Sequence, residues 1–276
     1  MRAVLADSWL AKIRLANVCR WPRFLPRAGC GLLLVLAADV SHAAGATPPP
    51  DARTLLTAMI DLTRGLTSYT EMTMQVHRPD WEKSSSLIAW TRGREDALIR
   101  FVAPAKDAGN ATLKLGRDMW TYAPKVNRVI RLPASLMSQS WAGSDFSYDD
   151  LSRSDELLVQ YDLRITATHT EGGHRVYDID ATPRTDAPVV WGMQRLRVRD
   201  DAILVEETFF DQDMKPLKRL SAVDINRLGG RMMATRLRMS DLREPNHYPE
   251  MTYRAARFDI PVDAQRVTQF ALRNQQ

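Results

Sequence analysis

The spacing of apolar residues changes once near the start of the chain. Between residues 51 and 65 apolar side chains recur every three or four positions, which predicts an amphipathic helix capped by Asp51 and closed by Gly65. From residue 68 the period becomes two: Met72, Met74 and Val76 alternate with polar residues in the stretch 68–78. The pattern therefore predicts one helix followed by strands.

About eleven such strand runs follow one another with short turns between them. Glycine and proline separate the runs, and turns such as EGG at 171–173, DQDMK at 211–215 and LGG at 228–230 are typical of hairpins. Helix and strand do not alternate regularly, so a parallel doubly wound sheet is excluded and an antiparallel meander is expected. The predicted runs cover 68–78, 84–93, 96–104, 111–124, 126–133, 157–170, 174–183, 192–200, 202–228, 231–242 and 249–260.

One segment interrupts the strands. Residues 134–144 and 147–158 each predict a short helix, and the stretch SWAGSDFSYDDL, residues 140–151, lies at their junction. Ser147 can cap the second helix, and acidic residues in its first turn would favour the positive end of the helix dipole. The fold class expected from the pattern is mainly β, with helices at the front and in the middle.

The first 44 residues predict an export signal. A basic stretch ends at Arg27, an apolar run follows at 28–40, and small residues precede a cleavage site after Ala43 or Ala44. We therefore expect a signal peptide over 1–44 and a single domain over 45–276. Both cysteines, Cys19 and Cys30, lie in the leader, so the mature chain would have no disulfide and no thiol nucleophile.

The formal net charge of +5 is concentrated at the N-terminus. Residues 1–44 contain six basic and two acidic residues, which leaves the rest nearly neutral. A clustered basic excess, the footprint of nucleic-acid binding, is not present. No nucleic-acid partner is expected.

The sequence offers no motif for a metal, nucleotide or nucleophile site. The histidines of the mature chain are widely separated, and neither HExxH, an EF-hand loop, GxSxG nor a phosphate-binding glycine loop occurs. No cofactor, no metal and no catalytic residue are therefore predicted. One alternative stays open: a hydrolase that would use the acidic cluster Asp145, Asp149 and Asp150.

Apolar surface is the remaining candidate chemistry. Eleven methionines and five tryptophans follow residue 44, and flexible thioethers suit a surface that adapts to varied apolar ligands. Ordinary core filling explains the same composition, so the count alone does not decide between the two.

Two stretches resemble the outer-membrane lipoprotein-sorting, LolA-like family of periplasmic proteins. They are RFVAPAKDAGNATLKLGRDMWTYAPKVNRVIRLP at 100–133 and SWAGSDFSYDDL, and EETFFDQDMKPLKRL at 206–220 adds to them. The resemblance extends over roughly residues 52–260. Ala142 departs from it, since a larger apolar residue such as Met is expected there.

The resemblance implies an incomplete antiparallel β-barrel of about eleven strands whose helices form a lid over an apolar concave face. It further implies a periplasmic, monomeric, non-enzymatic carrier that binds a lipid or the acyl chains of a lipoprotein and sorts them toward the outer membrane, with an RND- or ABC-type inner-membrane transporter as partner. A lipid sensor or adaptor subunit of such a transporter is the alternative. The expected cleft residues are Met72, Met74, Val76, Leu87, Trp90, Met119 and Trp120.

The stretch 140–151 is expected to be a structural clasp that fixes the frame of the lid. Gly143 would allow a sharp turn, Ser144 or Asp145 would bind loose backbone N–H groups, and two aromatic residues would anchor the middle helices to the sheet. The clasp residues are Trp141, Gly143, Ser144, Asp145, Phe146, Asp149 and Asp150. A one-residue slip exchanges the two faces of a strand, so the pattern does not say which face lines the cleft.

Overall fold

The computed structural model describes residues 50–152 and 156–274. Residues 48–276 form one compact unit. The predicted signal peptide, residues 1–44, lies outside the described residues. None of the described helices is both long and apolar enough to cross a membrane.

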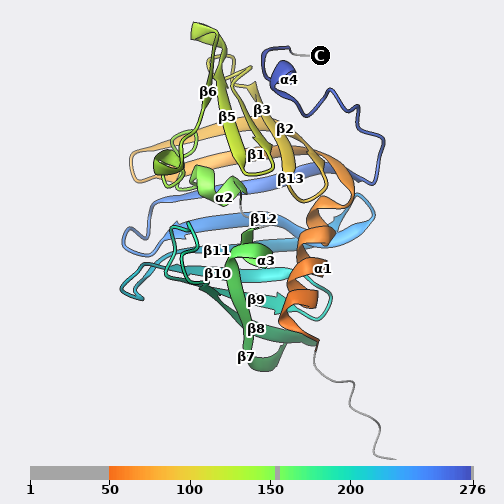
Figure 1. Cartoon of the computed structure of the whole chain (residues 1–276), viewed down its shortest axis with the longest axis vertical. Coiled ribbons are helices and arrows are strands. Elements are labelled where there is room, and N and C mark those ends of the chain that lie inside the picture. Colours follow the sequence, from red (N-terminus) through yellow and green to blue (C-terminus); the bar gives the residue numbers. More distant parts are fainter. Residues whose placement is uncertain (1–49, 153–155, 275–276) are drawn as a thin grey trace, which may run out of the picture. The chain divides into compact units, whose positions relative to one another are not determined.

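The described chain forms one antiparallel sheet of thirteen strands (Figure 1). The first meander comprises β1 (Thr67–Arg78), β2 (Trp81–Arg92), β3 (Asp96–Ala103), β4 (Ala111–Leu115), β5 (Asp118–Ala123) and β6 (Arg128–Arg131). The second comprises β7 (Tyr161–Glu171), β8 (His174–Pro183), β9 (Met193–Arg199), β10 (Leu204–Phe210), β11 (Pro216–Leu228), β12 (Arg231–Asp241) and β13 (Tyr248–Phe258).

The first and last strands join the two meanders in the middle of the sheet. β1 pairs with β13, so the strand order runs from β6 to β1 and then from β13 to β7. Within the described residues β6 and β7 are the two edges, and the sheet is open rather than closed into a barrel. This confirms the predicted mainly β, incomplete-barrel fold. The eleven predicted runs become thirteen strands because 111–124 folds back at Gly116 and 202–228 folds back at 211–215.

Helix α1 (Ala52–Arg64) forms where the apolar spacing predicted it. Asp51 caps its first turn by accepting a hydrogen bond from the Thr54 amide at 3.2 Å. Gly65 ends it with φ +61°, and a Cβ there would lie 2.6 Å from Asp259 Oδ1, so glycine is required on two grounds. Leu55, Leu56, Met59 and Ile60 form its buried stripe.

The chain between β6 and β7, residues 132–160, connects the two edges of the sheet, and we call it the crossing segment. Among its described residues, η2 (Ala134–Leu136), α2 (Tyr148–Ser152) and α3 (Glu156–Gln160) are helical. The helix predicted over 134–144 is wrong beyond η2. Ala142 and Gly143 adopt φ values of +54° and +72°, which a right-handed helix excludes.

Helices α1, α2 and α3 lie on one face of the sheet, which we call the inner face (Figure 1). Two apolar clusters fill it: α1 packs on β7–β9, and the clasp packs on the central strands. The end of the chain covers the opposite, outer face of β3–β5. Leu272 of α4 (Gln269–Arg273) and Val267, which precedes α4, pack there on Leu98 and Leu113. η1 (Pro124–Val126) forms the β5–β6 turn.

Candidate functional site

An apolar cavity of about 330 Å³ lies between the inner face, α1 and the clasp. The size falls at the lower end of the range of small-molecule sites, roughly 300–1,000 Å³. Both meanders, the C-terminal half of α1 and the clasp contribute to its wall, so segments far apart in the sequence meet there. Its apolar lining includes Met59, Met72, Ala89, Phe146, Phe209 and Met239.

Polar side chains of the cavity gather where α1 ends and β1 begins. The Ser68 and Thr91 hydroxyls lie 2.6 Å apart across the β1–β2 pair. Arg64, from the last turn of α1, donates to the carbonyls of Gly93 and Asp96 at 3.1 and 2.8 Å. These bonds hold the end of α1 against the β2–β3 turn. The members of this polar end are Thr63, Arg64, Ser68, Thr70, Thr91 and Tyr253.

The clasp is a tight turn whose aromatic residues close one wall of the cavity. The Trp141 amide donates to the Phe146 carbonyl at 2.7 Å, and the Ser144 hydroxyl accepts from the Phe146 amide at 3.2 Å. Trp141 Nε1 donates to Thr112 Oγ1 of β4 at 3.1 Å, and its ring packs on Phe101 of β3. Trp141 and Phe146 are therefore fixed on the sheet by both polar and apolar contacts.

The acidic residues of the clasp have different partners. Asp145 pairs with Arg78 at the end of β1 at 3.0 Å rather than with a backbone amide. Asp150 accepts from the Ser147 amide at 2.7 Å while the Ser147 hydroxyl accepts from the Asp150 amide, a reciprocal cap of α2. Asp149 is 7% exposed in the first turn of α2.

A buried ion pair connects the clasp to the second meander. Lys218 Nζ of β11 donates to Asp150 Oδ2, and the two side chains are 11% and 5% exposed. The ammonium also lies 4.7 and 5.1 Å from the ring centroids of Trp191 and Phe209. With Asp145 bound to β1 and Asp150 bound to β11, the clasp is held from both meanders.

The seven residues expected in the cleft divide between the two faces of the sheet. Met72 lines the cavity, and Met74, Val76 and Leu87 belong to the same inner-face cluster. Met119 of β5 lies opposite Lys114 of β4, and Lys114 lies opposite the cavity residue Ala97 of β3. Met119 therefore lies on the inner face, although it does not line the cavity. The two tryptophans, Trp90 and Trp120, pack in the outer-face cluster under the end of the chain.

Several cavity residues were not predicted from the sequence. Thr70 could have been found, because it lies one period-two step from Met72 on the same strand. Tyr253 and Phe209 carry no such signal, since only the pairing of β13 with β1 and the curvature of the sheet bring them to the cavity.

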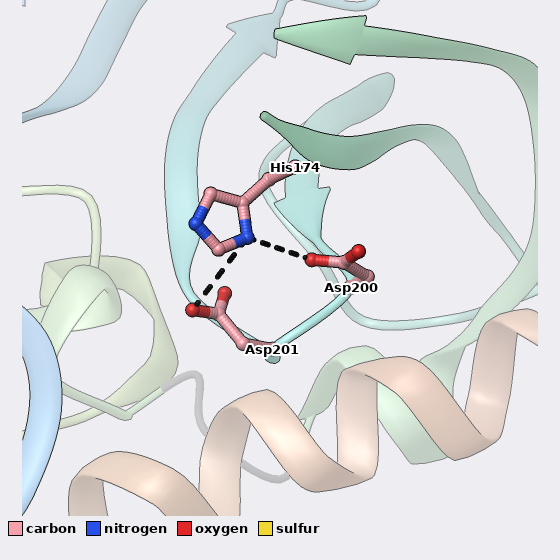
Figure 2. A group of neighbouring side chains, drawn as sticks. All are labelled: His174, Asp200 and Asp201. Atoms are coloured by element: carbon pink, nitrogen blue, oxygen red, sulfur yellow. Dashed lines mark hydrogen bonds and ion pairs between the residues drawn. The ribbon is translucent and has the colours of Figure 1, made fainter. Parts of the chain in front are cut away.

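One group of three potential metal ligands occurs in the part of the chain that the structure describes (Figure 2). His174 Nδ1 lies 2.9 Å from Asp200 and 4.0 Å from Asp201. Arg199 donates to both His174 Nε2 and Asp201, at 2.5 and 2.6 Å. The Arg199 guanidinium already binds Asp201 and would compete with a cation there, so this group fits a structural role in the β8–β9 region.

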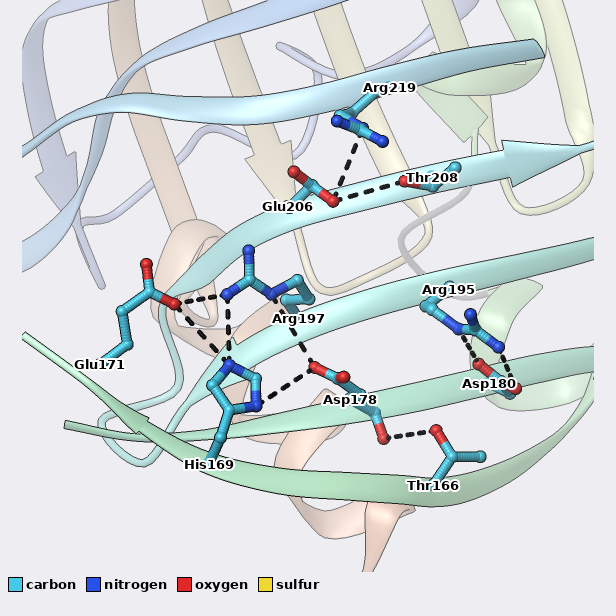
Figure 3. Close-up of polar contacts among 10 residues, drawn as sticks. All are labelled: Thr166, His169, Glu171, Asp178, Asp180, Arg195, Arg197, Glu206, Thr208 and Arg219. Carbon is cyan, nitrogen blue, oxygen red and sulfur yellow. Dashed lines mark hydrogen bonds and ion pairs between the residues drawn. The ribbon is translucent and has the colours of Figure 1, made fainter. Parts of the chain in front are cut away.

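The outer face of the second meander is polar (Figure 3). Arg195 makes a two-pronged contact with Asp180, and Arg197 lies between Glu171 and Asp178. Glu206 pairs with Arg219 on the next strand at 3.6 Å. Half-exposed ion pairs of this kind keep a sheet face polar, and salt screens the attraction between their charges.

The model of a family described as uncharacterized protein matches residues 93–274. No curated protein gives a significant match. A DUF1329 family protein from Desulfovibrio piger is 22% identical, with a TM-score of 0.73 over 80% of this chain and 97% of that one.

Two further solved structures share the fold. A putative outer membrane lipoprotein-sorting protein domain from Vibrio parahaemolyticus is 18% identical, with a TM-score of 0.69 over 81% of this chain and all, 100%, of that one. A LolA superfamily protein from Nitrosomonas europaea is 19% identical, with a TM-score of 0.68 over 80% and 99%. The chain belongs to the family of uncharacterized proteins whose model spans residues 93–274, and its fold is that of the LolA-like, outer-membrane lipoprotein-sorting proteins.

Proposed function

We propose that the protein is a non-enzymatic periplasmic carrier that binds an acyl chain of a lipid or lipoprotein in the cavity and helps to sort it toward the outer membrane. The observation that carries the proposal is the apolar cavity of about 330 Å³ between the inner face, α1 and the clasp. Transfer of an acyl chain out of water is favourable by about 0.8 kcal/mol per CH₂. A water-excluding slot on a LolA-like fold supplies that environment.

Export and transfer complete the proposal. Residues 1–44 would direct the chain to the periplasm as a cleaved signal peptide, and residues 45–276 would act as a single, monomeric domain. A carrier must also receive and release its ligand, so we include an RND- or ABC-type inner-membrane transporter as the partner. The clasp is bound to both meanders, and this supports a fixed wall against which the ligand is held.

A matched pair of substitutions tests the cavity. Ala89 on β2 lines the cavity, whereas its neighbour Ile88 lies on the outer face of the same strand. We expect native mass spectrometry of the detergent-free periplasmic protein to show bound phospholipid or acylated peptide. Ala89→Phe should lose that ligand, and Ile88→Phe should keep it.

Two results would contradict the carrier. One is an acyl ligand that persists in Ala89→Phe with an unchanged melting temperature. The other is an empty wild-type protein that co-purifies with a membrane protein, which would favour the sensor or adaptor alternative.

A further inference from the structure

Two hydroxyls at the polar end of the cavity differ from their neighbours. Ser68 bonds with Thr91, and the Thr63 hydroxyl donates to the Ile60 carbonyl at 3.1 Å. Tyr253 and Thr70 also line the cavity, yet within residues 50–152 and 156–274 neither hydroxyl makes a hydrogen bond. Both hydroxyls can therefore donate a hydrogen bond to a ligand in the cavity.

The two hydroxyl-bearing residues belong to adjacent strands. Tyr253 of β13 is paired with Met72 of β1, and Thr70 is one step from Met72 on the same face. Diagonal neighbours in a regular pair are separated by roughly 7–8 Å, within reach of a tyrosine side chain, and a β-bulge lies between Thr70 and Tyr253 in this pair. Arg64 and Tyr253 line the same cavity. Burial raises the pKa of Tyr253, and the positive charge of Arg64 opposes the shift.

The inner face of β1 changes from polar to apolar along its length. Its inward side chains are, in order, Ser68, Thr70, Met72, Met74 and Val76. Beyond Met72 the cavity wall includes the clasp aromatics and Phe209. A ligand with one polar and one apolar end would therefore have a preferred direction in the cavity.

Two carboxylates also contribute to the wall, at other places than the polar end. Asp150 is bound by Lys218 and by the Ser147 amide, and Glu207 of β10 likewise has an interaction within the protein. A carboxylate repels an acceptor oxygen. The head of an ester, amide or carboxylate would thus be disfavoured there and favoured beside Tyr253, Thr70 and Arg64.

We propose that Tyr253 and Thr70 donate hydrogen bonds to the acceptor oxygen at the head of a single acyl chain, with the methyl end of the chain directed toward Trp141 and Phe146. The ligand class is an ester- or amide-linked acyl group rather than a plain hydrocarbon. The inference rests on the proposed function, because it names the ligand class and the orientation within the same cavity.

The test is displacement of the fluorescent apolar probe N-phenyl-1-naphthylamine from the purified chain. Methyl dodecanoate and tridecane serve as competitors, which are similar in length and differ in the ester oxygens. Tyr253→Phe and Thr70→Val each remove one hydroxyl and keep the size of the side chain. Tyr69→Phe is the matched control, because Tyr69 lies on the outer face of β1 and its hydroxyl bonds with Glu71.

We expect each cavity variant to weaken the ester by about 3–10-fold, as the loss of one hydrogen bond predicts, and to leave tridecane unchanged. Tyr69→Phe should change neither competitor. Equal weakening of ester and hydrocarbon would show a packing effect and would overturn the inference, as would an ester affinity that does not change.

The two proposals fail in different ways. In the first case the probe binds the wild type and is excluded by Ala89→Phe, but Tyr253→Phe does not change the affinity for the ester. This result would remove the head-group assignment and leave the carrier function in place. A wild-type protein that binds no probe and no ester removes both the assignment and the carrier function.

Discussion

The ion pair between Lys218 and Asp150 gives the sharpest stability prediction. Both side chains are almost fully buried, at 11% and 5% exposure, and the pair connects β11 to the clasp. Lys218→Met keeps the length and apolar stem of the side chain and removes the charge. Asp150 then stays buried without the ammonium of Lys218, and Trp191 and Phe209 lose the cation that lies over their rings.

The expected cost follows from that burial. Removal of one partner of a buried ion pair typically destabilises a protein by about 3–5 kcal/mol, because the other charge stays desolvated. Asp150 also accepts from the Ser147 amide at 2.7 Å, which stabilises the remaining carboxylate, so the lower end of that range is expected. A loss of about 3 kcal/mol lowers Tm by roughly 6–12 °C in a domain of this size.

The assay is urea unfolding of the mature chain followed by circular dichroism, for Lys218→Met, Asp150→Asn and the double variant. The double variant should be more stable than Lys218→Met, because it removes the buried carboxylate charge together with the ammonium, and the cycle should give a coupling of at least about 1 kcal/mol. A Lys218→Met protein within about 0.5 kcal/mol of the wild type would refute the reasoning and would show that the pair is solvated in solution.

Four further predictions test other contacts. Arg231→Met should destabilise the protein by about 1–3 kcal/mol in urea unfolding, because Arg231 donates to the Asp61 and Leu62 carbonyls at the end of α1 at 2.9 and 3.0 Å; equal stability would show that α1 does not need this cap. Asp145→Ala should cost about 1 kcal/mol through the lost contact with Arg78, and Arg78→Met should then add little to it in the double variant. Gly143→Ala should lower Tm, since φ is +72° there, whereas Ala142→Gly should keep or raise Tm, since φ is already +54°; the opposite order would contradict the turn geometry. Hydrogen bonds from Arg243 lower the pKa of Asp241 below its ordinary value of 3.8, so its stabilising contribution is present above that pH and is lost as the pH falls toward the folded pKa; Asp241→Asn should flatten the acid side of the stability curve, and an unchanged curve would contradict this.

The sequence alone determined the elements whose signals are local. The 3.6-residue period with Asp51 and Gly65 at its ends specified α1, and alternation specified the strands, because both patterns follow from backbone geometry within a few residues. The Ser147 cap of α2 was also predictable for this reason. The breaks at Gly116 and at 211–215 also carry a local signal, a glycine in the first case and the polar stretch DQDMK in the second, and the chain folds back into a paired strand at each.

Only the tertiary structure decided which face of each strand is covered and by what. Leu87 and Trp90 lie three residues apart in β2, so they could never share a face, and packing of the chain end places Trp90 on the outer one. The same holds for the consecutive Met119 and Trp120. The cavity depends on contacts between distant segments, namely Tyr253 beside Met72 and Lys218 beside Asp150. Such pairs leave no periodic trace in the sequence, because their proximity is a consequence of the pairing of the first strand with the last.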